Sequence, residues 1–413
     1  MAAIGAWLFA IALFALGPVA VLASTQTTIV LGGAATGGLL LLIGRRQGWT
    51  GEGFQPFARF WPWAVWLFLL YVAASDEWVP LYGNGLDRAW RVAVSIVLAA
   101  IAWRGALRLE EGECGRAKLA LFAGIALAVA LLLVERITGN ALISVISGED
   151  LAIWTPAHNR AMSVLALLLP VVVGLLLDSG RRRAALACAP VIAAVVVTGD
   201  AGAGIVALLA GFCAWGLALY RPRLCAGLLT AAFALALFVM PSLYRQDAIM
   251  TPVVERAAQA SFSIQHRLLV LRFTADRIAE RPWLGWGARS ARDIPDGELT
   301  AADYAWTLDG SWPKLGMHPS AAMERVMPLH PHNAFFQLRL ELGLAGAALF
   351  LLAAATALWS AVRRQRPAAA AALLGTVAGA SALWGLGFGL WQNWLIAGLM
   401  LALVGCALLQ RPA

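Results

Sequence analysis

Long apolar runs, separated by short polar segments, follow one another along most of the chain. The runs centre on residues 4–23, 27–43, 61–75, 89–103, 117–134, 161–178, 184–198, 202–220, 224–241, 333–360, 368–386 and 389–409. Because an α-helix rises 1.5 Å per residue, about 20 apolar residues cross the hydrocarbon core of a bilayer. The runs lack the period-two alternation that is typical of strands in a membrane barrel. The pattern therefore predicts about 12 transmembrane helices, of which the third, fourth and seventh are short for a full crossing.

The composition agrees with this pattern and excludes two classes of protein. Of the 413 residues, 61% are hydrophobic and 13% are charged, whereas soluble domains are about 45–50% apolar and about 25% charged. A mean hydropathy of +0.75 fits neither a water-soluble globule nor a disordered chain. The 5 cysteines are scattered without a Cys-x-x-Cys pair, so they predict neither a disulfide framework nor a zinc site. We therefore expect an all-α polytopic membrane protein.

Lysine and arginine residues are distributed unevenly between the two sides of the predicted bundle. In the loops after even-numbered helices and in the tail there are 16 of them, and the short loops on the other side hold only Arg88, Arg91, Arg136 and Arg160. This bias places both termini in the cytoplasm, and we expect a polytopic inner-membrane protein. The net charge of +8 is thus a signal of topology, and no nucleic-acid partner is expected. No Lys or Arg precedes Val21-Leu22-Ala23, which favours an uncleaved first helix.

By this pattern the chain divides into three parts. Residues 1–240 hold the first nine helices, residues 241–332 form one long periplasmic loop, and residues 333–413 hold the last three helices. Within the loop, residues 263–281 predict an amphipathic helix that Pro282 ends. Its apolar stripe consists of Ile264, Leu268, Leu271, Ala275 and Ile278, and its flanks carry Arg267, Arg272, Arg277 and Arg281. Such a helix either lies in the membrane interface or packs over the bundle, and the pattern alone does not separate the two.

The segment that enters the tenth helix carries several polar side chains. If the helix begins near His332, steps of 100° place Arg339, Gly343 and Gly346 within about 40° of it, on one face. Arg339 and Glu341 would lie inside the helix, where an ionised side chain costs about 2.5–3.5 kcal/mol. Both therefore need partners, and they project to different faces. His332 could act as a general base near neutral pH, although a lone interfacial histidine is often inert and the glycines could serve helix packing alone.

These residues resemble a known signature. His332-Asn333, nine residues, Gly343, two residues and Gly346 are similar to the motif of the bacterial O-antigen ligase family, whose superfamily also contains O-antigen polymerases and O-oligosaccharyltransferases. The loop pattern from Ser263 through Arg267 to Pro282 and the sequence His158-Asn159-Arg160 are similar as well. The resemblance covers most of residues 155–410. It departs at Ala201, where family members often have an arginine. If that arginine usually helps to hold a phosphate, either another basic residue takes its role here or the chemistry is altered.

The resemblance implies a GT-C-like glycosyltransferase. It would transfer a glycan from undecaprenyl diphosphate to an acceptor sugar hydroxyl, on lipid A–core or another glycan, with inversion and with His332 as the base. Guanidinium groups match phosphate oxygens, and the candidates for the diphosphate are Arg160, Arg267, Arg339 and Arg289, with Arg292 as a further choice. Supporting roles are expected for Asn333, Glu341, Gly343, Gly346 and Asn159. The chain contains no Asp-x-Asp pair, so neither a divalent metal nor another cofactor is expected.

Other functions stay open at this point. A polymerase would use the same donor, fold and base, so the motif cannot separate it from a ligase. An oligosaccharyltransferase is less favoured, because the chain ends at Ala413 without the additional C-terminal region typical of that group. A transporter could use Arg339 and Glu341 within the membrane. Against a transporter, the sequence shows neither an inverted repeat nor a matching pair of interrupted helices.

Overall fold

The computed structural model describes residues 1–45, 61–78, 84–147, 156–199, 201–257, 262–308 and 322–410. Within these ranges the chain forms helices and loops, with an isolated β-bridge between Thr300 and Arg325 and no strand. Each of the predicted apolar runs contains a helix. The all-α class is therefore confirmed, and the chain is a multi-pass membrane protein.

The bundle is built from the helices that correspond to these runs. They are α1 (Ala2–Leu22), α2 (Thr27–Gly44), α3 (Trp61–Ala74), α4 (Gly85–Ala106), α5 (Glu111–Thr138), α7 (Pro156–Asp178), α8 (Arg182–Val197), α9 (Gly202–Tyr220), α10 (Pro222–Ala234), α16 (Ala334–Arg364), α17 (Pro367–Leu386) and α18 (Asn393–Ala407). α10 continues through the π-helical η4 (Leu235–Val239) into α11 (Met240–Leu243). In the described part of the chain, 9 helical segments are long and apolar enough to cross a membrane.

The lengths of the helices partly match the expectation. α3 has 14 residues and α8 has 16, so the third and seventh are short as predicted. The expectation for the fourth was wrong, because α4 has 22 residues. Its first two turns contain Asp87, Arg88 and Arg91. The pattern of hydrophobic positions alone therefore did not include these turns in the helix.

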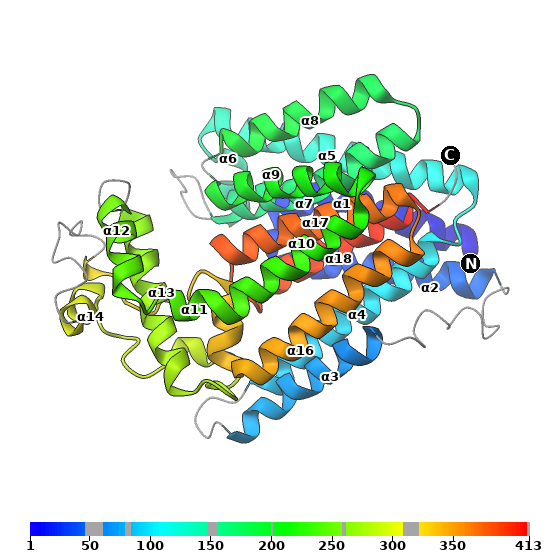
Figure 1. Ribbon diagram of the computed structural model, residues 1–413. Coiled ribbons are helices and arrows are strands. Elements are labelled where there is room, and N and C mark those ends of the chain that lie inside the picture. The colour runs from blue at the N-terminus through cyan, green and yellow to red at the C-terminus, as the bar shows by residue number, and fades with distance from the viewer. Residues whose placement is uncertain are drawn as a thin grey trace.

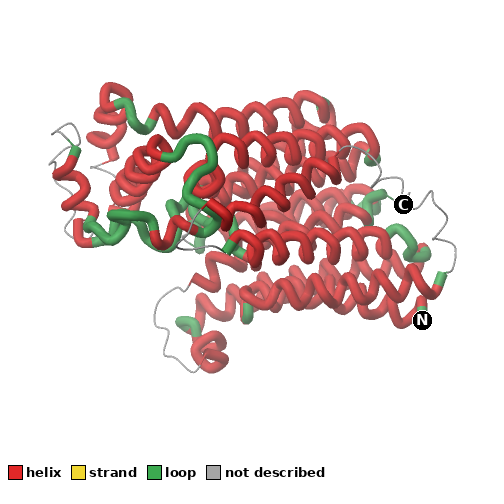
Figure 2. The backbone as a smooth tube through the Cα atoms, turned by 90° about the horizontal axis from the view of Figure 1, so that it is seen from below, coloured by secondary structure: helices red, strands yellow, loops and turns green. Residues whose placement is uncertain are grey.

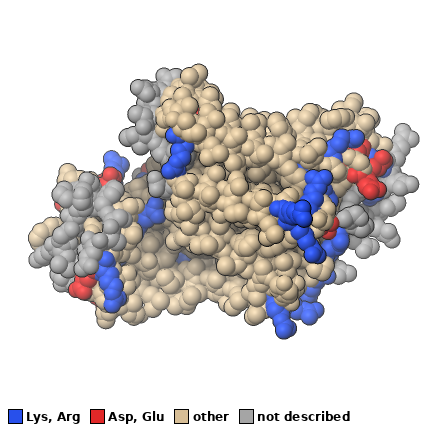
Figure 3. All heavy atoms as spheres, turned by 90° about the horizontal axis from the view of Figure 1, so that it is seen from above, with Lys and Arg blue, Asp and Glu red and all other residues tan. Residues whose placement is uncertain are grey.

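The long helices lie side by side, and both termini lie at the end of the bundle opposite to α12–α14 (Figures 1 and 2). α17 packs against α7, α9, α16 and α18 near the centre of the bundle. Every residue of α7 from Ala161 to Leu176 is buried. α1 crosses α5 where Gly17 faces Gly124, and a Cβ atom on either would lie within 2.1 Å of a backbone oxygen of the other helix. On the face shown in Figure 3, a broad uncharged surface separates charged side chains at the two ends, as expected for a membrane-embedded belt.

A second hydrophobic core lies at the end of the bundle that is remote from the termini. It is formed by α12 (Asp247–Ala257), α13 (Phe262–Glu280), α14 (Ala301–Thr307) and the start of α16. Phe273 of α13 and Phe336 of α16 are both almost fully buried in it. The short helices α6 (Ala141–Ser147), η1 (Ser24–Gln26), η3 (Ser75–Trp78) and η5 (Ser290–Asp293) complete the described structure.

The predicted amphipathic helix is present as α13. Of its predicted apolar stripe, Leu268, Ala275 and Ile278 are buried against other parts of the protein, whereas Ile264 is 46% exposed. α13 also contacts α16, α11, α12 and α14. The structure therefore favours the interpretation in which this helix packs over the bundle and uses its apolar face for protein contacts.

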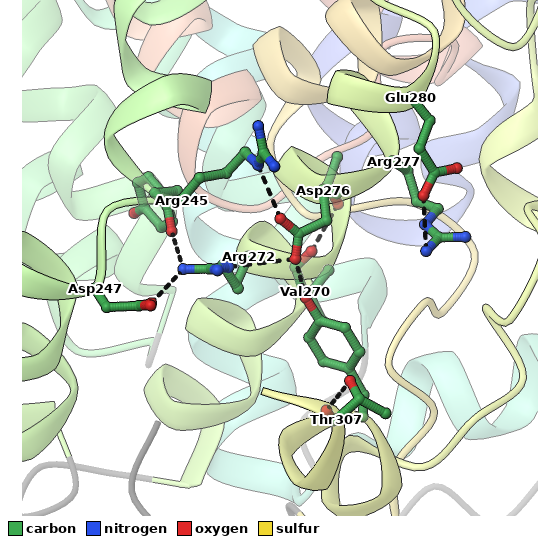
Figure 4. Close-up of polar contacts among 11 residues, drawn as sticks. Arg245, Asp247, Val270, Arg272, Asp276, Arg277, Glu280 and Thr307 are labelled. Carbon is green, nitrogen blue, oxygen red and sulfur yellow. Dashed lines mark hydrogen bonds and ion pairs between the residues drawn. The ribbon is translucent and has the colours of Figure 1, made fainter. Parts of the chain in front are cut away.

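One arginine of α13 is held by acidic side chains (Figure 4). Arg272, whose side chain is 10% exposed, donates to Asp247 Oδ1 at 2.6 Å. Its Nε lies 3.3 Å from Asp276 Oδ2, which also accepts a hydrogen bond from the Tyr304 hydroxyl at 2.6 Å. Arg245 donates to the other oxygen of Asp276 at 3.0 Å. These contacts connect α12, α13 and α14, so Arg272 stabilises this unit.

Replacing Arg272 with Gln should loosen the unit. The variant leaves Asp247 and Asp276 without a shared cation, and the loss of a charged hydrogen bond costs about 1.5–3 kcal/mol. We expect faster cleavage within residues 241–332 in limited proteolysis of the detergent-solubilised protein. Arg256→Gln is the matched control, because Arg256 is an exposed residue of the same unit. Equal cleavage rates for the two variants would contradict the structural role of Arg272.

Candidate active site

His332 lies in the loop immediately before α16, and a backbone carbonyl fixes its side chain. Its Nδ1 is 3.2 Å from the Gly387 carbonyl oxygen. Because a carbonyl oxygen only accepts hydrogen bonds, Nδ1 carries the proton and Nε2 keeps a lone pair. The backbone N–H of His332 donates to His330 Nδ1 at 3.1 Å, and His332 has a left-handed φ of 54°. The loop thus fixes the position and the tautomer of this imidazole.

His330 and His332 form a pair whose ring centroids are 4.7 Å apart. Burial lowers the pKa of His330 to about 4, and the charges of His332, Arg292 and Arg267 contribute. Burial also lowers the pKa of His332, the hydrogen bond to Gly387 opposes this shift, and Arg267 reinforces it. Both imidazoles are therefore neutral at pH 7. A neutral imidazole with a free Nε2 is the form that accepts a proton in general base catalysis.

The structure brings Arg267, one of the predicted arginines, into contact with this region. Arg267 of α13 donates to the Leu386 carbonyl oxygen at 2.7 Å, one residue before Gly387. Its positive charge acts on both histidines. Asn159 lies on the first turns of α7, next to Arg160, and its carbonyl oxygen accepts a hydrogen bond from the Ser163 hydroxyl at 2.7 Å.

Arg160 reaches the histidine pair indirectly. Its guanidinium carbon lies 6.0 Å from the ring centroid of Trp394, and one nitrogen lies 3.4 Å from Ser24 Oγ. Trp394 Nε1 donates to Gln392 Oε1 at 2.9 Å, and Gln392 Nε2 lies 3.3 Å from His330 Nε2. Two side chains therefore connect Arg160 to the histidines.

α16 starts at a side-chain cap and is interrupted nine residues later. Asn333 Oδ1 accepts hydrogen bonds from the backbone N–H groups of Phe335 and Phe336 at 3.0 and 3.1 Å, which is the usual role of an N-cap residue. At Gly343 the backbone leaves helical geometry, with φ 63° and ψ −162°. The predicted single face was therefore wrong, because His332 precedes the helix and Gly346 follows the interruption.

The Pro282–Gly287 turn packs into this interruption. The backbone N–H groups of Trp286 and Gly287 donate to the carbonyl oxygens of Leu340 and Glu341 at 2.9 and 2.7 Å. On the other side of the break, Leu344 N–H donates to the Pro282 carbonyl oxygen at 2.8 Å. A Cβ atom on Gly343 would lie 2.3 Å from the Trp283 carbonyl oxygen. Glycine is thus required at 343 both for its positive φ and for this close approach.

Glu341 is fully buried and connects three segments of the chain. Its Oε1 accepts from Gln337 Nε2 at 2.9 Å, and its Oε2 accepts from Trp391 Nε1 at 2.5 Å and from the Arg289 backbone N–H at 2.8 Å. Gln337 Oε1 in turn accepts from the Leu390 N–H at 2.8 Å. The pair of side chains therefore fixes the loop between α17 and α18, which supplies two of the contacts to the histidines.

The remaining predicted residues interact with other parts of the chain. Arg339 donates to the Pro282 carbonyl oxygen at 3.2 Å and is 7% exposed, so it supports the turn; as expected, it does not pair with Glu341. The charge of Arg289 acts on Arg88 and Asp87, on the start of α4. Gly346 is a packing position, since a Cβ atom there would lie 2.3 Å from Leu342 Cβ and 3.0 Å from Tyr71.

Sequence reasoning missed several residues of this region. Gln337 and Gln392 are polar residues inside or beside apolar runs, a signal that marks functional or buried polar contacts in membrane proteins. His330 could have been found from its place two residues before His332. Ala201 lies at the start of α9 and is 5% exposed; it brings no charge to the site.

Part of the chain is similar in sequence to known proteins. Residues 186–351 match the model of the O-antigen ligase family, and this confirms the resemblance for the segment that contains α13, His332 and the interruption of α16. A protein of Rickettsia conorii described as a "putative polysaccharide ligase" is 27% identical over 251 residues, which cover 57% of this chain and 52% of that relative. A protein of Rickettsia prowazekii with the same description is 39% identical over 89 residues, 22% of this chain and 18% of the relative. The chain thus spans about half the length of these relatives, or less.

Replacing Glu341 with Gln should destabilise the loop between α17 and α18, which contacts the histidine pair. An amide in this place turns one acceptor oxygen into a donor, which then faces another donor, and a buried polar group without a partner costs about 1–3 kcal/mol. We expect a lower midpoint of thermal unfolding in detergent. Glu255→Gln, the same change at an exposed position, serves as the control. An unchanged midpoint for Glu341→Gln would show that the three contacts do not stabilise the site.

Proposed function

We propose that this protein transfers a glycan from undecaprenyl diphosphate to a sugar hydroxyl of an acceptor such as lipid A–core. The reaction would take place at the periplasmic face of the bacterial inner membrane. One observation carries the proposal: His332 is neutral and has a free Nε2, and it lies beside Arg267 within the segment that matches the O-antigen ligase family. The description of the Rickettsia relatives as polysaccharide ligases supports the same reaction class.

In this reaction His332 Nε2 takes the proton of the acceptor hydroxyl. The oxygen attacks the anomeric carbon of the lipid-linked glycan, the bond from that carbon to the phosphate oxygen breaks, and undecaprenyl diphosphate leaves. The anomeric centre inverts because attack and departure occur on opposite sides. The hydrogen bond from Nδ1 to the Gly387 carbonyl stabilises the imidazolium that forms, in the way that an oriented acceptor assists a catalytic histidine.

The leaving diphosphate needs positive charge where its own negative charge develops. Arg267 is the first candidate, because its charge acts directly on His332. Arg160 is the second, because Trp394 and Gln392 connect it to His330. Arg339 would act indirectly, by holding the turn at Pro282. Arginines in these roles make a divalent metal unnecessary for the proposed chemistry.

Two observations support a site at the periplasmic face. The site lies at the end of the bundle remote from both termini (Figure 1). The bias of Lys and Arg toward the loops on the side of the termini marks that side as cytoplasmic. A donor flipped to the periplasmic leaflet would therefore meet the site from within the membrane.

His332→Ala should abolish transfer. Loss of a general base reduces the rate by about 10²–10⁴-fold, which is measurable with purified protein, undecaprenyl-diphosphate-linked glycan and acceptor. In cells, the variant or a deletion should accumulate long glycans on undecaprenyl diphosphate, with bare acceptor.

Two results would redirect this proposal. An acceptor that carries a single repeat would indicate a polymerase, and full activity of His332→Ala would remove the histidine from the mechanism. His266→Ala is the histidine control: His266 lies on α13, its Nε2 contacts the Arg325 carbonyl oxygen at 2.8 Å, and it affects His332 only as one of the charges that lower its pKa, so this variant should keep transfer activity. Chelation of divalent ions should leave activity unchanged, and its loss would contradict the role given to the arginines.

The acid limb of the pH profile should lie below the usual histidine pKa of about 6.5. Below its pKa His332 is protonated and cannot take a proton, and burial and Arg267 both lower that pKa. The rate, measured as kcat/KM between pH 4 and 8, should therefore fall only at a pH below about 6.5. Arg267→Gln removes one lowering contribution, so the limb of its residual activity should move to higher pH. A limb that stays in place would show that Arg267 does not act on the base.

A further inference from the structure

The hydrogen-bond network around His330 contains one more donor than it can pair. The backbone N–H of His332 points at His330 Nδ1 at 3.1 Å, so Nδ1 accepts and Nε2 carries the proton of the neutral ring. At the other end of the network, the indole N–H of Trp394 donates to Gln392 Oε1 at 2.9 Å. The amide of Gln392 therefore turns its NH2 group toward His330. The two nitrogen atoms that meet there, at 3.3 Å, are both donors.

Neither a different tautomer nor a turn of the amide removes this mismatch. A proton on His330 Nδ1 would face the N–H of His332, and an amide oxygen turned toward His330 would leave the NH2 group against the N–H of Trp394. The backbone N–H and the indole N–H have fixed directions, because each lies in the plane of a rigid group. Every arrangement of these groups thus keeps one contact between two donors, and a donor without an acceptor is unfavourable.

Packing holds the imidazole ring of His330 in this place. A Cβ atom at Gly389 would lie 3.0 Å from the ring, so the loop between α17 and α18 approaches it closely only because residue 389 is glycine. The ring of His332 meets the same ring edge-on. His330 and Gln392 are nevertheless partly exposed. The two side chains therefore present a pair of oriented N–H groups that a ligand can reach.

One oxygen atom from outside the network would satisfy both N–H groups. An oxygen can lie about 2.9 Å from each of two nitrogen atoms that are 3.3 Å apart. The residues that the structure describes supply no such oxygen, because the side-chain hydrogen bonds of His330 and Gln392 are those given above. Burial lowers the pKa of His330 to about 4, so the ring is a neutral donor at pH 7. A neutral imidazole N–H can stabilise an oxygen on which negative charge develops.

Positively charged side chains contact the chain on both sides of the loop that carries Gln392. Arg267 donates to the carbonyl oxygen of Leu386 at 2.7 Å, directly before the loop. The guanidinium carbon of Arg160 lies 6.0 Å from the ring centroid of Trp394, directly after it. Cations at both ends of this short segment favour an anionic group over a neutral one.

We propose that His330 Nε2–H and Gln392 Nε2–H together bind one phosphate oxygen of the lipid-linked donor. This inference rests on the proposed transfer reaction and adds two uncharged residues to its diphosphate site. A phosphate oxygen has lone pairs and no hydrogen of its own, so it removes the mismatch, whereas a sugar hydroxyl brings a further donor. Donors that are oriented before the reaction stabilise the charge that develops on the leaving group.

Nuclear magnetic resonance of the full-length protein with 15N-labelled histidine tests the first step. In phosphatidylcholine nanodiscs at pH 7, His330 should be neutral with its proton on Nε2, and undecaprenyl diphosphate should shift the Nε2 resonance. The spectrum of His330→Asn assigns this resonance by its loss. A proton on Nδ1 of His330, or an Nε2 resonance that undecaprenyl diphosphate does not move, would overturn the inference.

Binding of undecaprenyl diphosphate to variants tests the two donors separately. His330→Asn keeps an oxygen near the place of Nδ1 for the His332 N–H and has no group at the place of Nε2, whereas Gln392→Met removes the amide. Both variants should weaken binding about 10-fold. His330→Gln has an amide nitrogen near the place of Nε2 and loses the acceptor for His332, so it should keep binding and lower the kcat of transfer. Gln246→Met, the same change at an exposed position, is the control.

Other results would remove or reassign the site. Unchanged binding in His330→Asn and Gln392→Met would remove it, and an equal loss of phosphatidylglycerol binding would make it a general anion contact. A higher KM for the sugar acceptor, with unchanged binding of undecaprenyl diphosphate, would assign the oxygen to the acceptor. The resonance of the unmodified protein keeps the test valid if a variant does not fold. The spectra and the binding assays need no transfer, so their outcome is separate from full activity of His332→Ala, which would contradict the proposed reaction itself.

Discussion

A buried carboxylate in a helical bundle must find hydrogen-bond donors, and Glu341 finds them in three separate segments. The same stretch of α16 also contains buried backbone carbonyl groups that need hydrogen-bond donors. Because Gly343 interrupts the helix, the carbonyl groups of Leu340 and Glu341 lose their usual partners, and the turn after Pro282 supplies N–H groups in their place. The long segment between α11 and α16 is thereby fixed to the bundle by main-chain hydrogen bonds, which do not depend on side-chain identity.

The position of His332 follows from this arrangement. Gln337 and Glu341 hold the loop between α17 and α18. That loop presents the Gly387 carbonyl to the imidazole and, through Leu386, an acceptor to Arg267. A base and a cation are thus oriented by backbone oxygens of one loop. Rigid support of this kind holds a reacting group in productive geometry more accurately than a mobile loop does.

The fold could be predicted from the sequence to a large extent, because apolar runs in a membrane protein have few alternatives to helices. The polar beginning of α4 was missed because it follows no hydrophobic pattern. For the site, the pattern found His332, Arg267 and Glu341, each of which stands out as a polar residue in an apolar context. It could not find the interruption at Gly343, since glycine is also common in uninterrupted membrane helices. Nor could it show that the backbone at Ala288 and at Gly85 is held by side chains of the same short helix, because that depends on how η3 packs.

The nine residues between Asn333 and Gly343 form a helical stretch of fixed length. Their length is set at one end by the side-chain cap and at the other by the glycine that admits the turn. Each residue added or removed would rotate one end against the other by about 100° and shift it by about 1.5 Å. Glu341 would then point away from Trp391, and the cap would no longer place the imidazole beside Gly387. Repacking of neighbouring side chains can accommodate point substitutions on this stretch, but it cannot accommodate an insertion or a deletion. Related sequences should therefore differ here in residue type and keep the same number of residues.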